Sequence, residues 1–180
     1  DRAGRNSIIL KMDWASAYKH IAVRPEDVVL QFFNWLGMDF VELCLVFGCR
    51  SSAGLFDRLC KLVLALALLY TKFPKDQAIQ YLDDICAAAQ EGSTELDDLE
   101  AGFRKIADHL GVLLASTSDP DKAFSPTTAG VVLGVHYNTV SWTWSIPQEK
   151  LARLLHQIRH IDSQVQVQQF EIWSLTGRIL

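Results

Sequence analysis

Two adjacent aspartates, Asp83 and Asp84, stand between two short apolar runs, and this pattern constrains the fold more than any other feature of the chain. The runs cover residues 78–82 and 85–89, and each has the length of a strand. Because Asp is typical of tight turns, the pattern predicts two antiparallel strands that meet at a turn. The two carboxylates would then project from one end of a sheet.

A third carboxylate, Asp13, ends another predicted strand over residues 7–12, 70 residues before Asp83. If these strands share one sheet, three carboxylates meet at one sheet end. Carboxylates bind Mg²⁺, whose remaining ligands are commonly waters and substrate phosphates. Two such ions stabilise the attacking and leaving oxygens of a phosphoryl transfer. Asp pairs in solvated turns are common, so spacing alone also allows a turn without chemistry.

The segment between these carboxylates predicts a hairpin and a long helix. Residues 28–35 and 38–45 are two further apolar runs joined by a short turn. Apolar residues at three-to-four spacing then predict a helix that begins at Ser51 or Ser52 and ends before Pro74. The helix is nearly apolar all round at its end, so we expect it to be buried and central.

The second half of the chain predicts more helices and one more hairpin. The elements are, in order, an amphipathic helix over residues 93–110 with Gly111 past its end, strands over 131–137 and 141–146 turning at Asn138-Thr139, a helix from Pro147 to Ile161, and a helical pattern from Val167 to Leu180. The last pattern has no stop signal, which predicts that the native domain continues. Strands interleaved with helices indicate an α+β sheet domain.

The charge distribution leaves a nucleic-acid partner open. The formal net charge is -4, although phosphate contacts are made largely by Lys and Arg. The acidity is local, because residues 83–121 carry ten acidic and two basic side chains. The rest of the chain therefore carries a net charge of +4.

Cysteines and hydropathy indicate an intracellular protein, cytoplasmic or nuclear, without a membrane partner. Cys44, Cys49, Cys60 and Cys86 lack the spacing of a zinc site, so we interpret them as reduced core thiols. No signal-peptide pattern opens the chain. The most apolar run, residues 62–70, is far shorter than the roughly 20 residues that span a bilayer.

Three segments resemble the catalytic motifs of reverse transcriptases. Residues 11–18 (KMDWASAY) resemble the first motif, in which an aromatic residue follows the Asp by five positions. Residues 45–56 (LVFGCRSSAGLF) look like the second motif, and residues 81–84 (YLDD) match the signature tetrapeptide. Their order and spacing also agree with the family.

Later segments extend the resemblance over nearly the whole chain. Residues 133–135 (LGV) resemble the primer-grip hairpin, and residues 146–151 (IPQEKL) and 174–177 (SLTG) are similar to the segments after that hairpin in retrotransposon enzymes. The nearest group is that of the tyrosine-recombinase (DIRS-like) elements, with gypsy-like elements next. The parent would be a retroelement polyprotein.

The resemblance implies a polymerase palm, a ferredoxin- or RRM-like antiparallel sheet with helices on one face. Residues 1–20 and 48–138 would form the palm, and residues 21–47 a hairpin of the fingers. Residues 139–180 would form the end of the primer-grip hairpin and the truncated start of the thumb or connection.

The resemblance also implies site residues for metal and sugar. Asp13 and Asp83 would bridge two Mg²⁺ ions, or Mn²⁺ in their place, and Asp84 would complete the set. The Trp14 carbonyl would be a further ligand. Tyr18 would exclude the 2′-hydroxyl of the incoming nucleotide, although an aromatic core residue is the alternative.

Further roles are implied for base pair, primer and leaving group. Phe47 and Gly48 would form the floor near the nascent base pair, and Leu133 and Gly134 would hold the primer. Lys122 would protonate the leaving pyrophosphate, with an ordinary exposed lysine as the alternative.

The implied activity is RNA-directed DNA polymerisation, in which dNTPs are added to a primer on an RNA or DNA template. The family usually has Pro where Val46 stands, so the loop before the long helix is expected to have a different shape here. The basic fingers residues of the family lie upstream of its first motif and are absent here, as is most of the thumb, so the isolated fragment is expected to be poorly active. A free sheet edge favours homodimers. Two alternatives stay open: an inactive palm that serves as a scaffold or RNA-binding module, and a different metal-dependent nuclease.

Overall fold

The computed structural model describes residues 4–164 and 166–179. Its main sheet has four antiparallel strands in the order β4-β5-β1-β6. The strands are β1 (Ile8–Asp13), β4 (Ala78–Tyr81), β5 (Asp84–Ala89) and β6 (Phe124–Thr127). The two apolar runs around the aspartate pair are therefore adjacent strands, and the strand before Asp13 lies beside them, as the sequence predicts.

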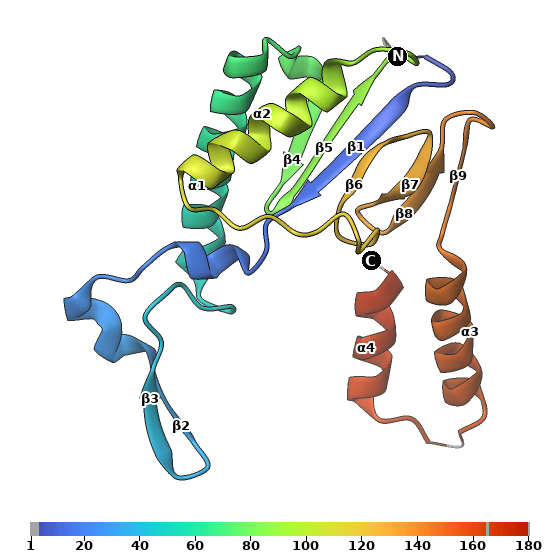
Figure 1. Cartoon of the computed structure of the whole chain (residues 1–180). Helices are drawn as coiled ribbons and strands as arrows, with labels where there is room; N and C mark the ends of the chain where they lie inside the picture. The colour runs from blue at the N-terminus through green and yellow to red at the C-terminus, as the bar shows by residue number, and fades with distance from the viewer. Residues whose placement is uncertain (1–3, 165, 180) are drawn as a thin grey trace.

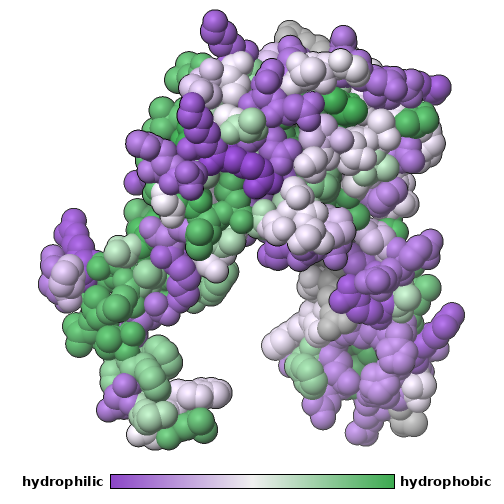
Figure 2. Space-filling model, viewed as in Figure 1, coloured by the Kyte–Doolittle hydropathy of each residue, from purple (hydrophilic) through white to green (hydrophobic). Residues whose placement is uncertain are grey.

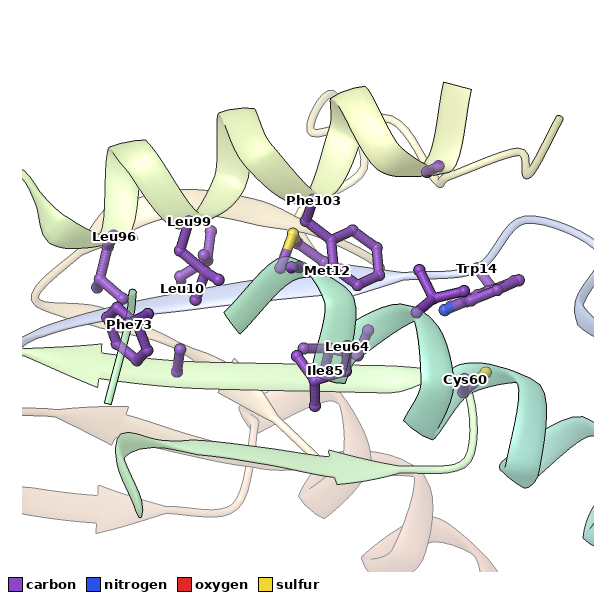
Figure 3. Packing of buried hydrophobic residues seen from close by; sticks show 14 of the residues in the cluster. Leu10, Met12, Trp14, Cys60, Leu64, Phe73, Ile85, Leu96, Leu99 and Phe103 are labelled. Carbon is purple, nitrogen blue, oxygen red and sulfur yellow. The ribbon is translucent and has the colours of Figure 1, made fainter. Parts of the chain in front are cut away.

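Two helices, α1 (Arg50–Thr71) and α2 (Glu95–His109), cover one face of this sheet (Figure 1). Side chains alternate between the two faces of a strand. Leu10 and Met12 of β1 therefore point toward the helices, where they lie in one cluster with Phe103 of α2 and with Trp14, which directly follows β1 (Figure 3). Each fully buried large apolar side chain contributes roughly 1.5–3 kcal/mol. This layer fixes the position of the strand ends.

Helix α1 is not central, contrary to the expectation from its apolar sequence. Leu62, Leu66 and Leu69 are 57%, 41% and 77% exposed, because the sheet and α2 cover only one side of the helix. Its N-cap is Cys49 rather than a serine. It ends at Thr71, with Lys72 as a C-cap in the left-handed conformation, and so before Pro74 as predicted. None of the described helices has the length and apolarity needed to cross a membrane.

The first half of the chain also forms a projecting arm (Figure 1). Strands β2 (Phe32–Trp35) and β3 (Met38–Val41) form the predicted hairpin, and every residue of both strands is exposed. The arm begins with two short 3-10 helices, η1 (Ala17–His20) and η2 (Pro25–Gln31), so the strand predicted from Val28 begins four residues later.

A second, three-stranded sheet follows the main one. It contains β7 (Ala129–Val132), β8 (Val135–Asn138) and β9 (Thr143–Ser145) in that order. The prediction of one strand over residues 131–137 is wrong, because Leu133 and Gly134 both have positive φ and turn the chain there.

The remaining helices complete the chain. A short 3-10 helix, η3 (Lys75–Gln77), joins α1 to β4. At the other end, α3 (Gln148–Asp162) and α4 (Gln169–Ile179) form a second projection (Figure 1).

Only two of the four cysteines are core residues. Cys60 and Cys86 are buried, and burial raises the pKa of each thiol to about 12. Cys49 is exposed and Cys44 is half-buried, so the prediction of four core thiols is wrong for these two. All four thiols are free.

Candidate active site

The three predicted aspartates lie at one end of the main sheet. Asp13, the last residue of β1, is directly opposite Asp84, the first residue of β5. Directly opposed residues of antiparallel strands have Cβ atoms roughly 4.5–5.5 Å apart. Asp83 lies in the two-residue turn between β4 and β5, where Leu82 has a φ of 53°. A positive φ at the first turn position and not the second is typical of a type II′ hairpin turn.

Asp13 is buried with only part of its carboxylate satisfied. Its side chain is 6% exposed, and its Oδ2 lies 3.3 Å from the Lys122 ammonium nitrogen. Its Oδ1 is buried and has no hydrogen-bond partner within the described residues. Burial raises the pKa of Asp13 above its ordinary 3.8, the Lys122 contact opposes the rise, and the nearby charges of Asp83 and Asp84 add to it. The contact with Asp13 raises the pKa of Lys122 in turn.

Lys11 also belongs to this cluster, although the sequence motifs predict no role for it. The residue is 6% exposed, yet it carries an ammonium group. Its Nζ lies 3.2 Å from Asp84 Oδ1 and donates a hydrogen bond of 2.8 Å to the carbonyl of Asp121. The sequence could have indicated this contribution of Lys11, because residues two apart in a strand lie on the same face of the sheet, as Lys11 and Asp13 do.

The residues fit a divalent cation in part. No group of three His, Cys, Asp or Glu residues within 4–164 and 166–179 is gathered closely enough to hold a metal ion. Two of the three aspartates contact lysines, whereas none of the hydrogen bonds or ion pairs of the described residues engages Asp83. A buried carboxylate oxygen without a partner is costly. The Asp13 Oδ1 is such an oxygen, and a hard cation would satisfy it.

Two of the predicted nucleotide-binding residues, Tyr18 and Phe47, contact each other through their rings. The Tyr18 ring, on η1, lies 4.6 Å from the Phe47 ring and 5.4 Å from Phe56 of α1. Phe47 is 81% exposed, and Gly48 has a φ of 86° that favours glycine. The Trp14 side chain is buried in the core, so only its backbone is left for the predicted contact.

The predicted primer-grip residues form the β7–β8 turn. Leu133 and Gly134 have φ values of 48° and 80°, which is typical of a type I′ hairpin. A side chain at Gly134 would collide with the ammonium group of Lys150 on α3. Among the described residues, no hydrogen bond or ion pair links this turn to the aspartates.

A cavity of about 680 Å³ lies away from the aspartates. It is lined mainly by apolar side chains of the uncovered sheet face and of the second sheet, including Ile9, Cys86, Val132 and Trp144. None of the three aspartates lines it. The carboxylate cluster is therefore a site on the sheet end rather than a deep pocket.

Comparison with solved structures identifies the fold. A foamy viral protease-reverse transcriptase in complex with an RNA/DNA hybrid matches 95% of this chain with a TM-score of 0.70 at 18% identity. A foamy viral protease-reverse transcriptase in complex with dsDNA matches 96% of this chain with a TM-score of 0.67 at 17% identity. The chain has a reverse-transcriptase-like fold.

This likeness is one of structure alone. The chain spans between 20% and 32% of the length of those two enzymes. No protein-family model matches the sequence, and a search of curated proteins finds no match. The α+β, palm-like arrangement expected from the motifs is confirmed, with antiparallel sheets and helices on one face of the main sheet.

Proposed function

We propose that this chain is the palm region of an RNA-directed DNA polymerase of a retrotransposon, of DIRS-like or gypsy-like type. The proposal rests on the sheet end, where Asp13 lies opposite Asp84 and within the electrostatic influence of Asp83. One buried oxygen of Asp13 has no hydrogen-bond partner there. The proposed partners are a template-primer and dNTPs. The structures of the foamy viral enzymes support these partners, because those enzymes are in complex with an RNA/DNA hybrid or with dsDNA.

The proposed site binds its cations through Asp13 and Asp83. Mg²⁺ ions, when bound, would stabilise the charge that develops on the attacking and leaving oxygens. Asp13 would offer its unpartnered Oδ1, and Asp83 projects from a tight turn whose backbone is fixed by β4 and β5. Mn²⁺ is a suitable substitute, because it also prefers oxygen ligands.

Lys122 would donate a proton to the leaving pyrophosphate. Its side chain is 58% exposed, so it can leave Asp13 and turn toward a phosphate. The contact with Asp13 raises the pKa of Lys122, so leaving Asp13 removes that rise and makes the ammonium a better proton donor. A general acid must be protonated and able to reach the leaving group.

Tyr18 would select the sugar of the incoming nucleotide. Phe56 and Phe47 flank its ring and restrict where the ring can move. A fixed ring beneath the sugar would exclude a 2′-hydroxyl and so favour deoxynucleotides. The exposed Phe47 and the Gly48 backbone would lie under the base pair.

A duplex has open space to occupy beside this end of the sheet. Figure 2 shows a wide hollow between the β2–β3 arm and the α3–α4 projection. In Figure 1 the end of β1 lies at the inner side of this hollow. This arrangement supports a template-primer path that passes the carboxylates.

An inactive scaffold is the second candidate. It is favoured by the ion pairs of Lys11 and Lys122, which neutralise two of the three carboxylates without any metal. A scaffold would bind nucleic acid without metal-dependent chemistry. Metal binding therefore separates the two candidates.

The test is Mn²⁺ binding followed by addition of a single nucleotide to a primer on an RNA template. We expect Asp13→Asn and Asp83→Asn to weaken Mn²⁺ binding and to abolish addition, while Asp108→Asn, an exposed change on α2, alters neither. A chain that binds no Mn²⁺, or an addition activity that survives Asp13→Asn, would exclude the polymerase assignment.

A further inference from the structure

Two lysines reach the carboxylate cluster, and their surroundings differ. The Lys11 side chain is 7% exposed, whereas that of Lys122 is 58% exposed. An ammonium group buried without a partner costs several kcal/mol, whereas an exposed ammonium group is solvated by water when it leaves its partner. The folded chain therefore needs the ion pair of Lys11 for its stability, whereas water can replace Asp13 as the partner of Lys122.

The contacts of Lys11 join two separate segments. One partner is Asp84 at the start of β5, and the other is the Asp121 carbonyl in the loop before β6. Asp121 directly precedes Lys122. The ammonium group of Lys11 therefore links the carboxylate end of the sheet to the backbone that carries Lys122.

The loop around Lys122 is itself braced. The Lys122 and Ala123 amides each donate a hydrogen bond of 3.0 Å to the Asp119 carbonyl. The Asp121 amide donates to the Asp119 side chain at 3.2 Å. Because this turn is closed on itself, one contact at Asp121 is enough to fix where Lys122 leaves the loop.

The same contact decides which carboxylates remain for a cation. Asp84 Oδ1 is held by a buried ammonium group, which would be left without its counter-charge if Asp84 turned to a cation. Asp13 is held through Oδ2 only, and by a lysine that is free to move. The cluster thus divides into Asp13 and Asp83, which can accept a cation, and Asp84, which is already neutralised.

We propose that Lys11 is a positioning residue, that Asp84 serves to hold it rather than to bind metal, and that the pair sets the position of Lys122. This inference rests on the proposed function and assigns Asp84 a role different from the one its motif implies. Lys11 touches no substrate in it. It acts through Asp84 and through the loop at Asp121.

Mn²⁺ binding to the metal-free chain separates the roles of the aspartates. We expect Asp13→Asn to weaken binding by about tenfold or more, as loss of a direct ligand should. The double variant Lys11→Met/Asp84→Asn should bind as the unaltered chain does, because it removes both charges of the pair together. Binding by the folded double variant that is as weak as in Asp13→Asn would make Asp84 a ligand and overturn the proposal.

The link to the loop is measured without metal. Lys11→Met should lower the unfolding temperature and speed hydrogen exchange at the Lys122 and Ala123 amides, and Asp84→Asn alone should also lower the unfolding temperature. The double variant should recover the unfolding temperature while the two amides still exchange fast. Unchanged exchange at these amides in Lys11→Met would show that the contact does not position Lys122.

Nucleotide addition gives the third readout. Lys11→Met should lower kcat by about 10–100-fold and leave KM for the dNTP nearly unchanged, because the proton donor is misplaced while the binding groups stay. A change confined to KM would overturn the positioning role. If no variant adds a nucleotide and Asp13→Asn binds Mn²⁺ as the unaltered chain does, the proposed function fails. Hydrogen exchange at the Lys122 and Ala123 amides would still decide whether Lys11 fixes the position of the loop.

Discussion

The main sheet and the β2–β3 arm are both rich in apolar residues, but only the sheet buries them. Leu10, Met12 and Ile85 are at most 1% exposed beneath α1 and α2, whereas Phe32 and Trp35 of the arm are 55% and 64% exposed. The difference is the second layer, which the arm lacks. A lone two-stranded hairpin is marginally stable in water.

This contrast indicates where rigidity and where recognition are to be expected. The sheet end is rigid, because the strands that carry the aspartates belong to a packed layer. The arm presents a large apolar surface, and such surfaces are typical of interaction sites. Four kinds of substitution would test the contrast, in order of decreasing effect.

Truncation of a core aromatic residue should have the largest effect. Phe103→Ala removes a fully buried ring of α2 and should lower the free energy of unfolding by about 3–5 kcal/mol. Phe32→Ala in the arm should change it by less than about 0.5 kcal/mol. Urea denaturation of both variants is the measurement, and similar losses would show that the arm is as well packed as the sheet.

Breaking a buried ion pair should come next. Lys11→Met leaves Asp84 without its partner and should cost about 3 kcal/mol of folding free energy. Lys19→Met, which breaks the exposed pair with Glu42 near the arm, should leave the denaturation midpoint unchanged. A loss in Lys19→Met equal to that in Lys11→Met would contradict the difference in burial.

Glycine substitution should cost about the same at the two hairpin turns. Gly37→Ala in the arm introduces only the strain of a positive φ, because nothing lies near the new side chain. Gly134→Ala has the same strain and meets only the flexible end of the Lys150 side chain, which can move away, so each variant should cost about 1–2 kcal/mol. Denaturation midpoints of the two variants give the comparison, and a clearly larger loss at Gly134 would show that the Lys150 ammonium group is held in place.

The smallest effect is a gain in stability. The folded pKa of Asp13 is raised above its ordinary 3.8, so its ionised form costs stability at neutral pH, and the cost disappears as pH falls through the folded pKa and below 3.8. Asp13→Asn should therefore stabilise the metal-free chain by about 1 kcal/mol at neutral pH and by less at acidic pH. Asp39→Asn in the exposed arm is the matched control. The measurement is denaturation at neutral and at acidic pH in the presence of a chelator. An Asp13→Asn variant that is no more stable than the unaltered chain at neutral pH would contradict the prediction.

Much of the site could be predicted from local patterns. Residues 78–82 and 85–89 have the length and composition of strands, and Asp83-Asp84 between them predicts the turn. The strand ending at Asp13 was equally clear. The motifs then predicted that these two distant segments meet, which the register of Asp13 with Asp84 bears out.

Local patterns failed where one residue decided between two conformations. Leu133 lies in the left-handed region, which its side chain does not favour, and only Gly134 signalled the turn inside the apolar run at residues 131–137. Ser51 and Ser52 are good caps by type, yet the helix begins before them. Such choices depend on neighbouring elements and not on intrinsic preference.

Periodicity and turn chemistry are local properties, so the amino-acid order was enough to specify most elements, their succession and the acidic residues at the strand ends. Burial depends instead on how the elements pack. Packing leaves Leu62, Leu66 and Leu69 of α1 exposed, although the composition predicted a central helix, because no layer covers that side. Packing also buries Lys11 between Asp84 and the Asp121 carbonyl, because the pairing of charges depends on segments that lie far apart along the chain.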